Sequence, residues 1–161
     1  MRETTLCYIL RGDQVLMLHR TKKKNDLNHD KWIGVGGHLE PGETPEVCVL
    51  REALEETGLT LTECAYRGVV RFRTDDGADE DMHLFTCTGF TGALRVCDEG
   101  DLQWIDRGRL FGLPMWEGDR IFLNLLERGE PFFDLTLRYR GETLERAELN
   151  GRALNGKDLH P

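Results

Sequence analysis

The sequence has no long apolar run and no pair of cysteines at C-x-x-C spacing. Its N-terminal apolar stretch extends only from Leu6 to Leu10 before Arg11, which is too short for a membrane span or a signal sequence. We therefore expect a cytoplasmic protein without a targeting segment. The odd number of cysteines favours reduced thiols, so we predict no disulfide and no zinc site; the five are Cys7, Cys48, Cys64, Cys87 and Cys97.

The sequence also has no excess of positive charge. The 161 residues carry a formal net charge of −8, which argues against a protein that grips long nucleic acid by neutralising its phosphates. A small anionic ligand can still bind if metal ions screen its charge. The chain has no linker, repeat or low-complexity stretch, and its length suits one domain. We expect residues 1–150 to form this domain and residues 151–161 to be a frayed tail.

The most informative stretch, Gly37 to Leu59, joins a glycine-rich loop to a predicted helix. Thr44 suits the N-cap and Pro45 the first helical position, while Gly58 stands where a left-handed residue ends a helix. Both ends of this helix are therefore marked in the sequence.

Charged side chains share one face of this helix. At about 100° per residue they fall within an arc of about 140°. The set is Arg51, Glu52, Glu55 and Glu56. We expect the opposite side, with Val47, Leu50, Ala53 and Leu54, to face the core. An acidic face is ordinarily a solvated surface, but Glu52 and Glu56 are spaced i,i+4 and repel unless a cation lies between them. Because Mg²⁺ prefers carboxylate oxygens with room for water and phosphates, the pattern favours a metal site.

The same stretch resembles the Nudix box, G-x5-E-x7-R-E-U-x-E-E-x-G-U, in which U is aliphatic. Every fixed position matches, and only Ala53 is smaller than the usual aliphatic residue. The matching positions are Gly37, Glu43, Arg51, Glu52, Glu55, Glu56, Gly58 and Leu59. This resemblance implies the Nudix fold, an α/β/α sandwich with a mixed central sheet. It also implies hydrolysis of a diphosphate that is linked to another group.

The order of predicted elements agrees with an α+β or mixed α/β domain with helices on two sides of a sheet. Further helices are expected at Arg107–Phe111 and Trp116–Arg128. The expected strands are Thr5–Leu10, Val15–His19, Lys31–Val35, Ala65–Thr74, Met82–Phe90, Leu94–Val96, Leu102–Ile105, Phe133–Tyr139 and Leu144–Leu149.

The resemblance also implies a set of metal ligands, with Mg²⁺ as the cofactor and Mn²⁺ as an alternative. Glu55 and Glu56 would bind the metal, and Glu52 would be a ligand or the general base toward the attacking water. The carbonyl of Gly36 or Gly37 would be a further ligand. Which glutamate is the base differs among family members.

Five more residues complete the expected phosphate side of the site. Arg51 would orient a box glutamate by a bidentate contact, and Glu43 would lock the loop to the helix. Glu99 fits the place of a later carboxylate that completes the metal shell in the family, or it is an exposed loop glutamate. Arg20 meets a phosphate or is a surface cation. His38 stands where many relatives have lysine, so it offers no permanent cation.

Outside the box, the chain is similar to the MutT-type branch, particularly bacterial 8-oxo-dGTP diphosphatases, through residues 31–37 (KWIGVGG) and 115–119 (MWEGD). In such enzymes an aromatic ring stacks on the base and an acidic side chain reads its edge. Trp116 and Asp119 fit these places, although a core aromatic and a helix N-terminal charge are the structural alternatives. Ile33 replaces an asparagine of vertebrate-type relatives and can only pack against a base.

The leading hypothesis is Mg²⁺-dependent hydrolysis of 8-oxo-dGTP, or a related oxidised purine nucleotide, to the monophosphate and pyrophosphate. Such an enzyme sanitises the nucleotide pool for DNA synthesis. The box also suits unmodified nucleotides, ADP-ribose or dinucleoside polyphosphates. A third hypothesis is a non-catalytic module that binds a nucleotide, but the intact box argues against it because a pure binder needs no base. The expected partner is a small nucleotide, without long nucleic acid or membrane.

Overall fold

The computed structural model describes residues 1–22 and 25–161. Its strands are β1 (Arg2–Arg11), β2 (Gln14–His19), β3 (Trp32–Ile33), β4 (Val35–His38), β5 (Thr60–Thr74), β6 (Glu80–Thr91), β7 (Asp101–Asp106), β8 (Phe133–Arg140), β9 (Thr143–Leu149) and β10 (Arg152–Ala153). The α-helices are α1 (Pro45–Thr57) and α2 (Glu117–Glu127), and the 3₁₀ helices are η1 (Arg107–Gly112) and η2 (Gly156–Asp158). No helix of this described part is long and apolar enough to cross a membrane.

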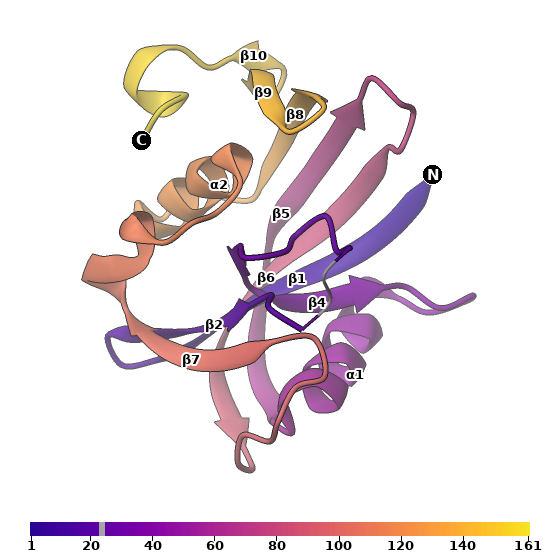
Figure 1. The fold of residues 1–161 in the computed structure, drawn as a ribbon, viewed down its shortest axis with the longest axis vertical. Helices are drawn as coiled ribbons and strands as arrows, with labels where there is room; N and C mark the ends of the chain where they lie inside the picture. Colours follow the sequence, from indigo (N-terminus) through magenta and orange to yellow (C-terminus); the bar gives the residue numbers. More distant parts are fainter. Residues whose placement is uncertain (23–24) are drawn as a thin grey trace.

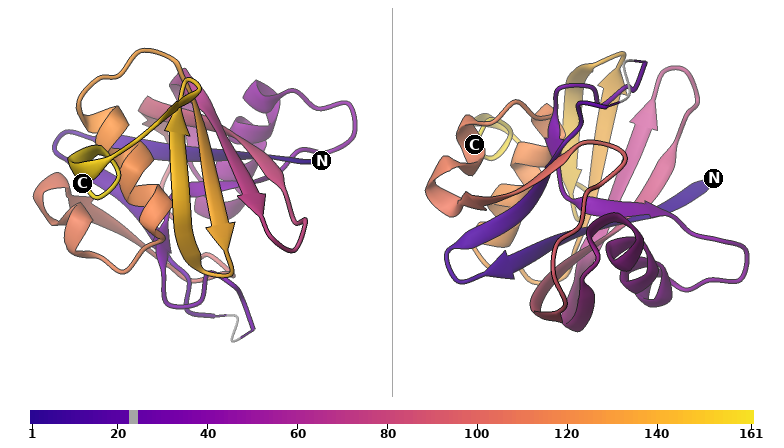
Figure 2. Two further views of the ribbon diagram at one scale, coloured as in Figure 1. Left: turned by 90° about the horizontal axis from the view of Figure 1, so that it is seen from above. Right: turned by 60° about the horizontal axis from the view of Figure 1, so that its bottom comes forward.

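One mixed sheet organises the fold (Figure 1). The strand order is β10-β9-β8-β5-β6-β1-β2-β3, while β4 pairs with β1 and β7 pairs with β2. The pairs β1·β6 and β5·β8 are parallel, and the others are antiparallel. Figure 2 shows α1 and α2 on opposite sides of this sheet. The predicted α/β/α sandwich with a mixed sheet is therefore confirmed.

Strand β1 separates two apolar cores because its side chains alternate between the faces of the sheet. Leu6 and Tyr8 belong to the core under α2, whereas Cys7 and Ile9 belong to the core under α1. Burial on both faces explains why this strand reads as an almost continuous apolar run. Since β1 also pairs with β4, it carries the glycine strand next to α1.

Helix α1 begins and ends as predicted. The Thr44 side chain accepts a hydrogen bond from the Val47 amide at 3.3 Å, and Gly58 ends the helix at φ 82°. Its predicted core side was wrong except at Ala53. The buried residues are Cys48, Val49, Ala53 and Thr57. Val47, Leu50 and Leu54 are 54%, 44% and 47% exposed. The reason is that Glu52 and Glu56 turn toward the sheet side, which shifts the buried arc away from these apolar residues.

Two chain segments also differ from expectation. Leu94–Val96 is irregular rather than a strand, because Arg95 fastens it to the end of α1 through its amide and the Thr57 carbonyl at 3.0 Å. The segment after residue 150 is ordered instead of frayed: β10 pairs with β9, and Leu154 and Leu159 pack on the core under α2.

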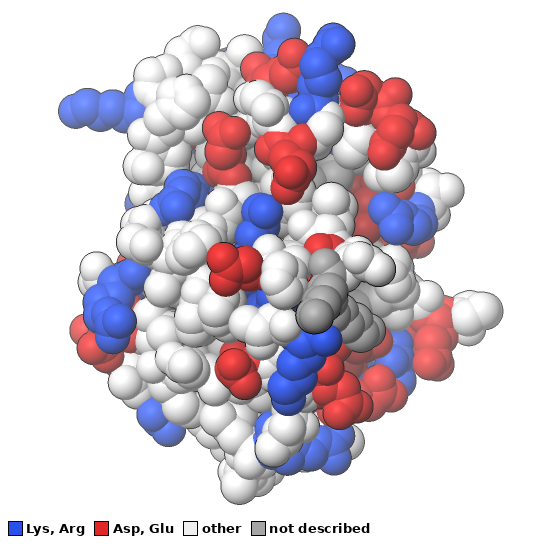
Figure 3. Space-filling view, viewed as in Figure 1, with Lys and Arg blue, Asp and Glu red and all other residues white. Residues whose placement is uncertain are grey.

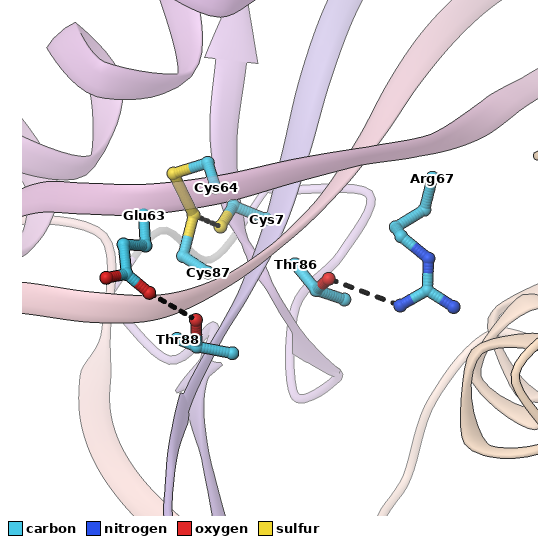
Figure 4. The surroundings of a disulfide bond; sticks show 7 residues. All are labelled: Cys7, Glu63, Cys64, Arg67, Thr86, Cys87 and Thr88. Carbon is cyan, nitrogen blue, oxygen red and sulfur yellow. Dashed lines mark hydrogen bonds between the residues drawn. A yellow bond between two sulfur atoms is a disulfide. The ribbon is translucent and has the colours of Figure 1, made fainter.

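Cys64 and Cys87 form a disulfide, so the prediction that the chain contains none was wrong (Figure 4). The two residues are direct partners on β5 and β6, which a separation of 23 residues does not reveal. The Cys7 Sγ atom lies 3.1 Å from the Cys87 Sγ atom, so three sulfur atoms meet at this point. The free cysteines, Cys7, Cys48 and Cys97, are buried.

Candidate active site

Glycines let strand β4 lie unusually close to its neighbours. A Cβ atom on Gly36 would lie 1.9 Å from the Thr5 carbonyl oxygen on β1. On Gly37 it would lie 2.5 Å from the carboxyl carbon of Glu52 on α1. A side chain at residue 36 would clash with the backbone of β1, and one at residue 37 would displace the Glu52 carboxyl group, so the glycines let β4 border the acidic helix.

Arg51 connects the glycine loop with the acidic face of α1. Its Nε and Nη2 atoms donate to the two carboxylate oxygens of Glu43 at 2.7 and 2.8 Å. Its Nη1 atom donates to Glu52 at 2.9 Å and to Glu55 at 3.3 Å, while Nη2 also reaches the His38 carbonyl at 3.1 Å. The bidentate partner is thus Glu43, and Glu52 is held through one oxygen.

Glu43 fixes the loop that precedes α1. The Arg51 guanidinium, followed by the Glu40 amide, lowers the pKa of Glu43 to about 2. That amide donates to Glu43 at 3.0 Å. Glu43 therefore stays ionised near neutral pH and ties the loop to the helix.

The carboxyl groups of Glu52 and Glu99 lie near that of Glu56. Burial is the main cause that raises the pKa of Glu56 to about 9, and the charges of Glu99 and Glu52 add to it. Arg20 opposes this effect, and it donates to Glu99 at 3.0 Å and to Asp26 at 2.7 Å. Arg20 therefore faces the carboxylate group rather than standing free as a phosphate ligand.

This arrangement fits a divalent cation by charge and by donor type. The crowded carboxylates and the carbonyl of Gly37 are hard oxygen donors, and a cation would offset both the burial and the neighbouring charges that raise the pKa of Glu56. Within residues 1–22 and 25–161, no three His, Cys, Asp or Glu side chains already surround a common metal position. Glu55 is the outermost of the expected ligands, since its side chain is 58% exposed and turned to Arg51.

Trp116 lies on the other side of the sheet, just before α2. Its ring is half-buried, and its Nε1 atom donates to Asn28 at 2.7 Å. The Lys31 ammonium lies 4.4 Å from the ring centroid, and Tyr139 meets the ring edge-to-face at 5.7 Å. Lys31 therefore covers a ring face on which a base would stack.

Asp119 is 6% exposed, and no described residue donates a hydrogen bond to its carboxyl group. Burial raises the pKa of Asp119 to about 7, against the lowering effect of Arg120. The carboxyl group can therefore be neutral or charged near pH 7.

Tyr8 is a polar residue that the sequence analysis missed. It is 1% exposed, and its hydroxyl has no hydrogen-bond partner in the described chain. Burial and then the charge of Asp119 raise the pKa of Tyr8. Its ring borders Gly34, where a Cβ atom would lie 3.1 Å from Tyr8 Cε1. A tyrosine within an otherwise apolar strand was the available signal.

Ile33 and His38 occupy different parts of the site. Ile33 is half-buried at the end of β3, and the neighbouring Trp32 amide donates to the Pro114 carbonyl at 2.8 Å, which ties β3 to the segment before α2. His38 is exposed, and its backbone carbonyl, not its ring, contacts Arg51. The face in Figure 3 shows acidic and basic side chains interspersed.

The acidic helix α1, fixed against the glycine strand β4 of a mixed sheet, is the arrangement that the box resemblance implies for a pyrophosphohydrolase. Residues 1–126 match the NUDIX domain family. The uncharacterized Nudix hydrolase YvcI of Bacillus subtilis is 30% identical over 147 residues, which cover 88% of this chain and 89% of that protein. The oxidized purine nucleoside triphosphate hydrolase of Danio rerio is 30% identical over 129 residues, covering 80% and 81%.

Solved structures give the same result. The crystal structure of the MutT protein from Bacillus halodurans has a TM-score of 0.83 and 26% sequence identity, and the match covers 93% of this chain and 98% of that one. The chain belongs to the Nudix family and is a MutT-type Nudix pyrophosphohydrolase.

Proposed function

We propose that the protein hydrolyses 8-oxo-dGTP, or a related oxidised purine nucleoside triphosphate, to the monophosphate and pyrophosphate, with Mg²⁺ or alternatively Mn²⁺. The buried carboxyl group of Asp119 carries this proposal. Oxidation at C8 converts the N7 acceptor of guanine into an N–H donor, for which a carboxylate is a suitable acceptor. The similarity to the Danio rerio oxidized purine nucleoside triphosphate hydrolase supports the same substrate class.

The proposed base pocket combines polar and apolar contacts. Asp119 would bind the base edge, and Trp116 would stack on the base after Lys31 moves from its ring. Tyr8 adds a buried hydroxyl that lacks a partner. Ile33 would contact the base by packing alone, which suits a range of purines rather than one.

The proposed metal ligands are Glu52, Glu55, Glu56, Glu99 and the Gly37 carbonyl, with Gly36 beside them. The divalent ion would neutralise phosphate oxygens and polarise the attacking water. Arg51 holds one oxygen of Glu52, so the carboxylate has a fixed orientation toward the water whose proton it accepts. His38 and Arg20 border the phosphate side, and Arg20 positions Glu99 through their 3.0 Å contact.

The test is a panel of nucleotides with Mg²⁺, scored by kcat/KM and by the released phosphate product. The panel pairs 8-oxo-dGTP with dGTP, and adds other triphosphates, ADP-ribose and a dinucleoside polyphosphate. We expect 8-oxo-dGTP to exceed dGTP by roughly tenfold or more and to release pyrophosphate. Equal values for both would overturn the oxidised-purine assignment, and a preference for ADP-ribose would replace it.

A further inference from the structure

The views of Figure 2 show no other helix or strand over the outer side of α1, and exposed apolar side chains form a ridge on that side. Leu50 and Leu54 are spaced i,i+4, and Val47 precedes Leu50 by three residues on the same side of the helix. All three are roughly half exposed, although large apolar side chains are ordinarily buried where the fold permits. At about 100° per residue, this ridge points away from Glu52 and Glu56. It is therefore separate from the candidate active site.

An apolar groove runs beside this ridge, between α1 and β5. Its volume is about 280 Å³, and its walls include Val49 of α1, Leu61 and Tyr66 of β5, and Phe85 of β6. The exposed ring of Phe132 packs edge-to-face on Tyr66 with 5.1 Å between centroids, which adds apolar surface next to this groove wall. The same surface thus presents a ridge and a groove next to each other.

Opposite charges mark the two ends of the ridge. Glu46 precedes Leu50 by one helical turn and borders the groove. Arg95 lies at the other end, where Nη2 donates to the carbonyls of Leu54 and Glu55 at 2.7 Å each. Within the described ranges, neither Glu46 nor Arg95 has an oppositely charged side-chain partner. They cannot pair with each other, since eight residues of helix span about 12 Å.

We propose that this surface binds a second copy of the chain, with the two α1 helices antiparallel about a twofold axis. Along the ridge, an acidic residue (Glu46) is followed by Leu50 and Leu54 and then by a basic residue (Arg95). In an antiparallel pair, Glu46 of each copy therefore meets Arg95 of the partner subunit. The leucine ridge of each copy enters the groove of the other, as i±4 ridges do in helix packing. An antiparallel pair also places the positive helix end beside the negative one. Charge complementarity selects a second copy over an unrelated apolar peptide.

The ridge points away from Glu52 and Glu56, and the proposed dimer does not depend on which nucleotide is hydrolysed. Its test is therefore distinguishable from that of the proposed function. Light scattering after gel filtration and sedimentation velocity, over about a hundredfold range of protein concentration, measure the dimer dissociation constant. We expect a dimer for the unchanged chain. A monomer throughout this range would overturn the proposal.

Leu50→Glu tests the ridge. Because Leu50 is exposed in the monomer, this variant should fold with an unchanged melting temperature of the monomer and raise the dissociation constant by roughly a hundredfold. Leu27→Glu is the matched control, as Leu27 is an exposed leucine outside this surface, and it should leave the dimer intact. A dimer that survives Leu50→Glu would mean that another surface forms it.

A charge-reversal experiment tests the predicted partners. Glu46→Arg and Arg95→Glu should each weaken the homodimer by roughly tenfold, since like charges then face each other twice. Mixing the two variants should restore a heterodimer, because both contacts between them regain opposite charges. The mixture reports contacts between chains only, so misfolding of one variant cannot imitate the result. Failure of the mixture to associate more tightly than either variant alone would overturn the antiparallel arrangement.

Discussion

The carboxyl group of Glu52 lies directly against the α-carbon of Gly37, where an added Cβ atom would be 2.5 Å from the carboxyl carbon. Strand β4 and helix α1 therefore meet at the point where the box places its proposed base. The absence of a side chain at residue 37 decides the position of Glu52.

Gly37→Ala should impair catalysis more than folding. The new methyl group meets the end of a flexible side chain, so Glu52 can move aside while the backbone stays in place. We expect kcat to fall by roughly a hundredfold or more, with a melting temperature close to that of the unchanged chain. Gly108→Ala is the control, since a Cβ atom there has no neighbour within 4 Å. Normal turnover by Gly37→Ala would show that Glu52 needs no fixed position.

Asp119→Asn should remove a pH dependence of stability. Folding raises the pKa of Asp119 from 3.8 to about 7. Between about pH 4 and about pH 7, the Asp119 carboxyl group is therefore protonated in the folded state and ionised in the unfolded state. The unchanged chain should therefore lose stability as pH rises from about 4 to about 7, by at most roughly 4 kcal/mol. Urea unfolding at several pH values checks this, with the exposed Asp98→Asn as control. Parallel pH profiles for the unchanged chain and Asp119→Asn would contradict the buried acid.

Tyr8→Phe separates structure from substrate recognition. Removing a buried hydroxyl without a partner should stabilise the fold by roughly 1 kcal/mol. If the hydroxyl contacts the base, the same change should raise KM for purine nucleotides by roughly tenfold and leave kcat nearly constant. Thermal melting and steady-state kinetics on one preparation measure both effects. A gain in stability with unchanged KM would make Tyr8 a purely structural residue.

The disulfide between Cys64 and Cys87 should stabilise the protein. It closes a loop with a sequence separation of 23 residues, for which restriction of the unfolded chain contributes roughly 3 kcal/mol. Alkylation of the unfolded, unreduced chain should label the three free cysteines, Cys7, Cys48 and Cys97, as counted by mass spectrometry. Cys64→Ser should lower the free energy of unfolding. Labelling of all five cysteines would contradict the bond.

Sequence signals between neighbouring residues correctly predicted the helix and the first strand pair around the site. The cap at Thr44 and the glycine at residue 58 located both ends of α1, and the two strands expected at Thr5–Leu10 and Val15–His19 lie within the antiparallel pair β1 and β2. Such features depend on neighbours in the chain, so the sequence is sufficient to find them.

Features that depend on distant partners were missed. Cys64 meets Cys87 only through the register of β5 and β6, and Arg20 pairs with Glu99 across 79 positions. The spacing of apolar residues identified an apolar side of α1. It does not reveal whether another segment of the chain packs on that side, and Leu50 was therefore wrongly placed in the core.

Turnover of Glu52→Gln on the best nucleotide substrate tests the central claim, that the carboxylates of α1 carry out the hydrolysis. This substitution keeps the shape of the side chain and removes its ability to accept a proton. We predict that kcat falls by roughly two to four orders of magnitude while the melting temperature stays the same. Glu63→Gln, an exposed glutamate on β5, should leave turnover unchanged. Near-normal turnover of Glu52→Gln would contradict the role assigned to this helix.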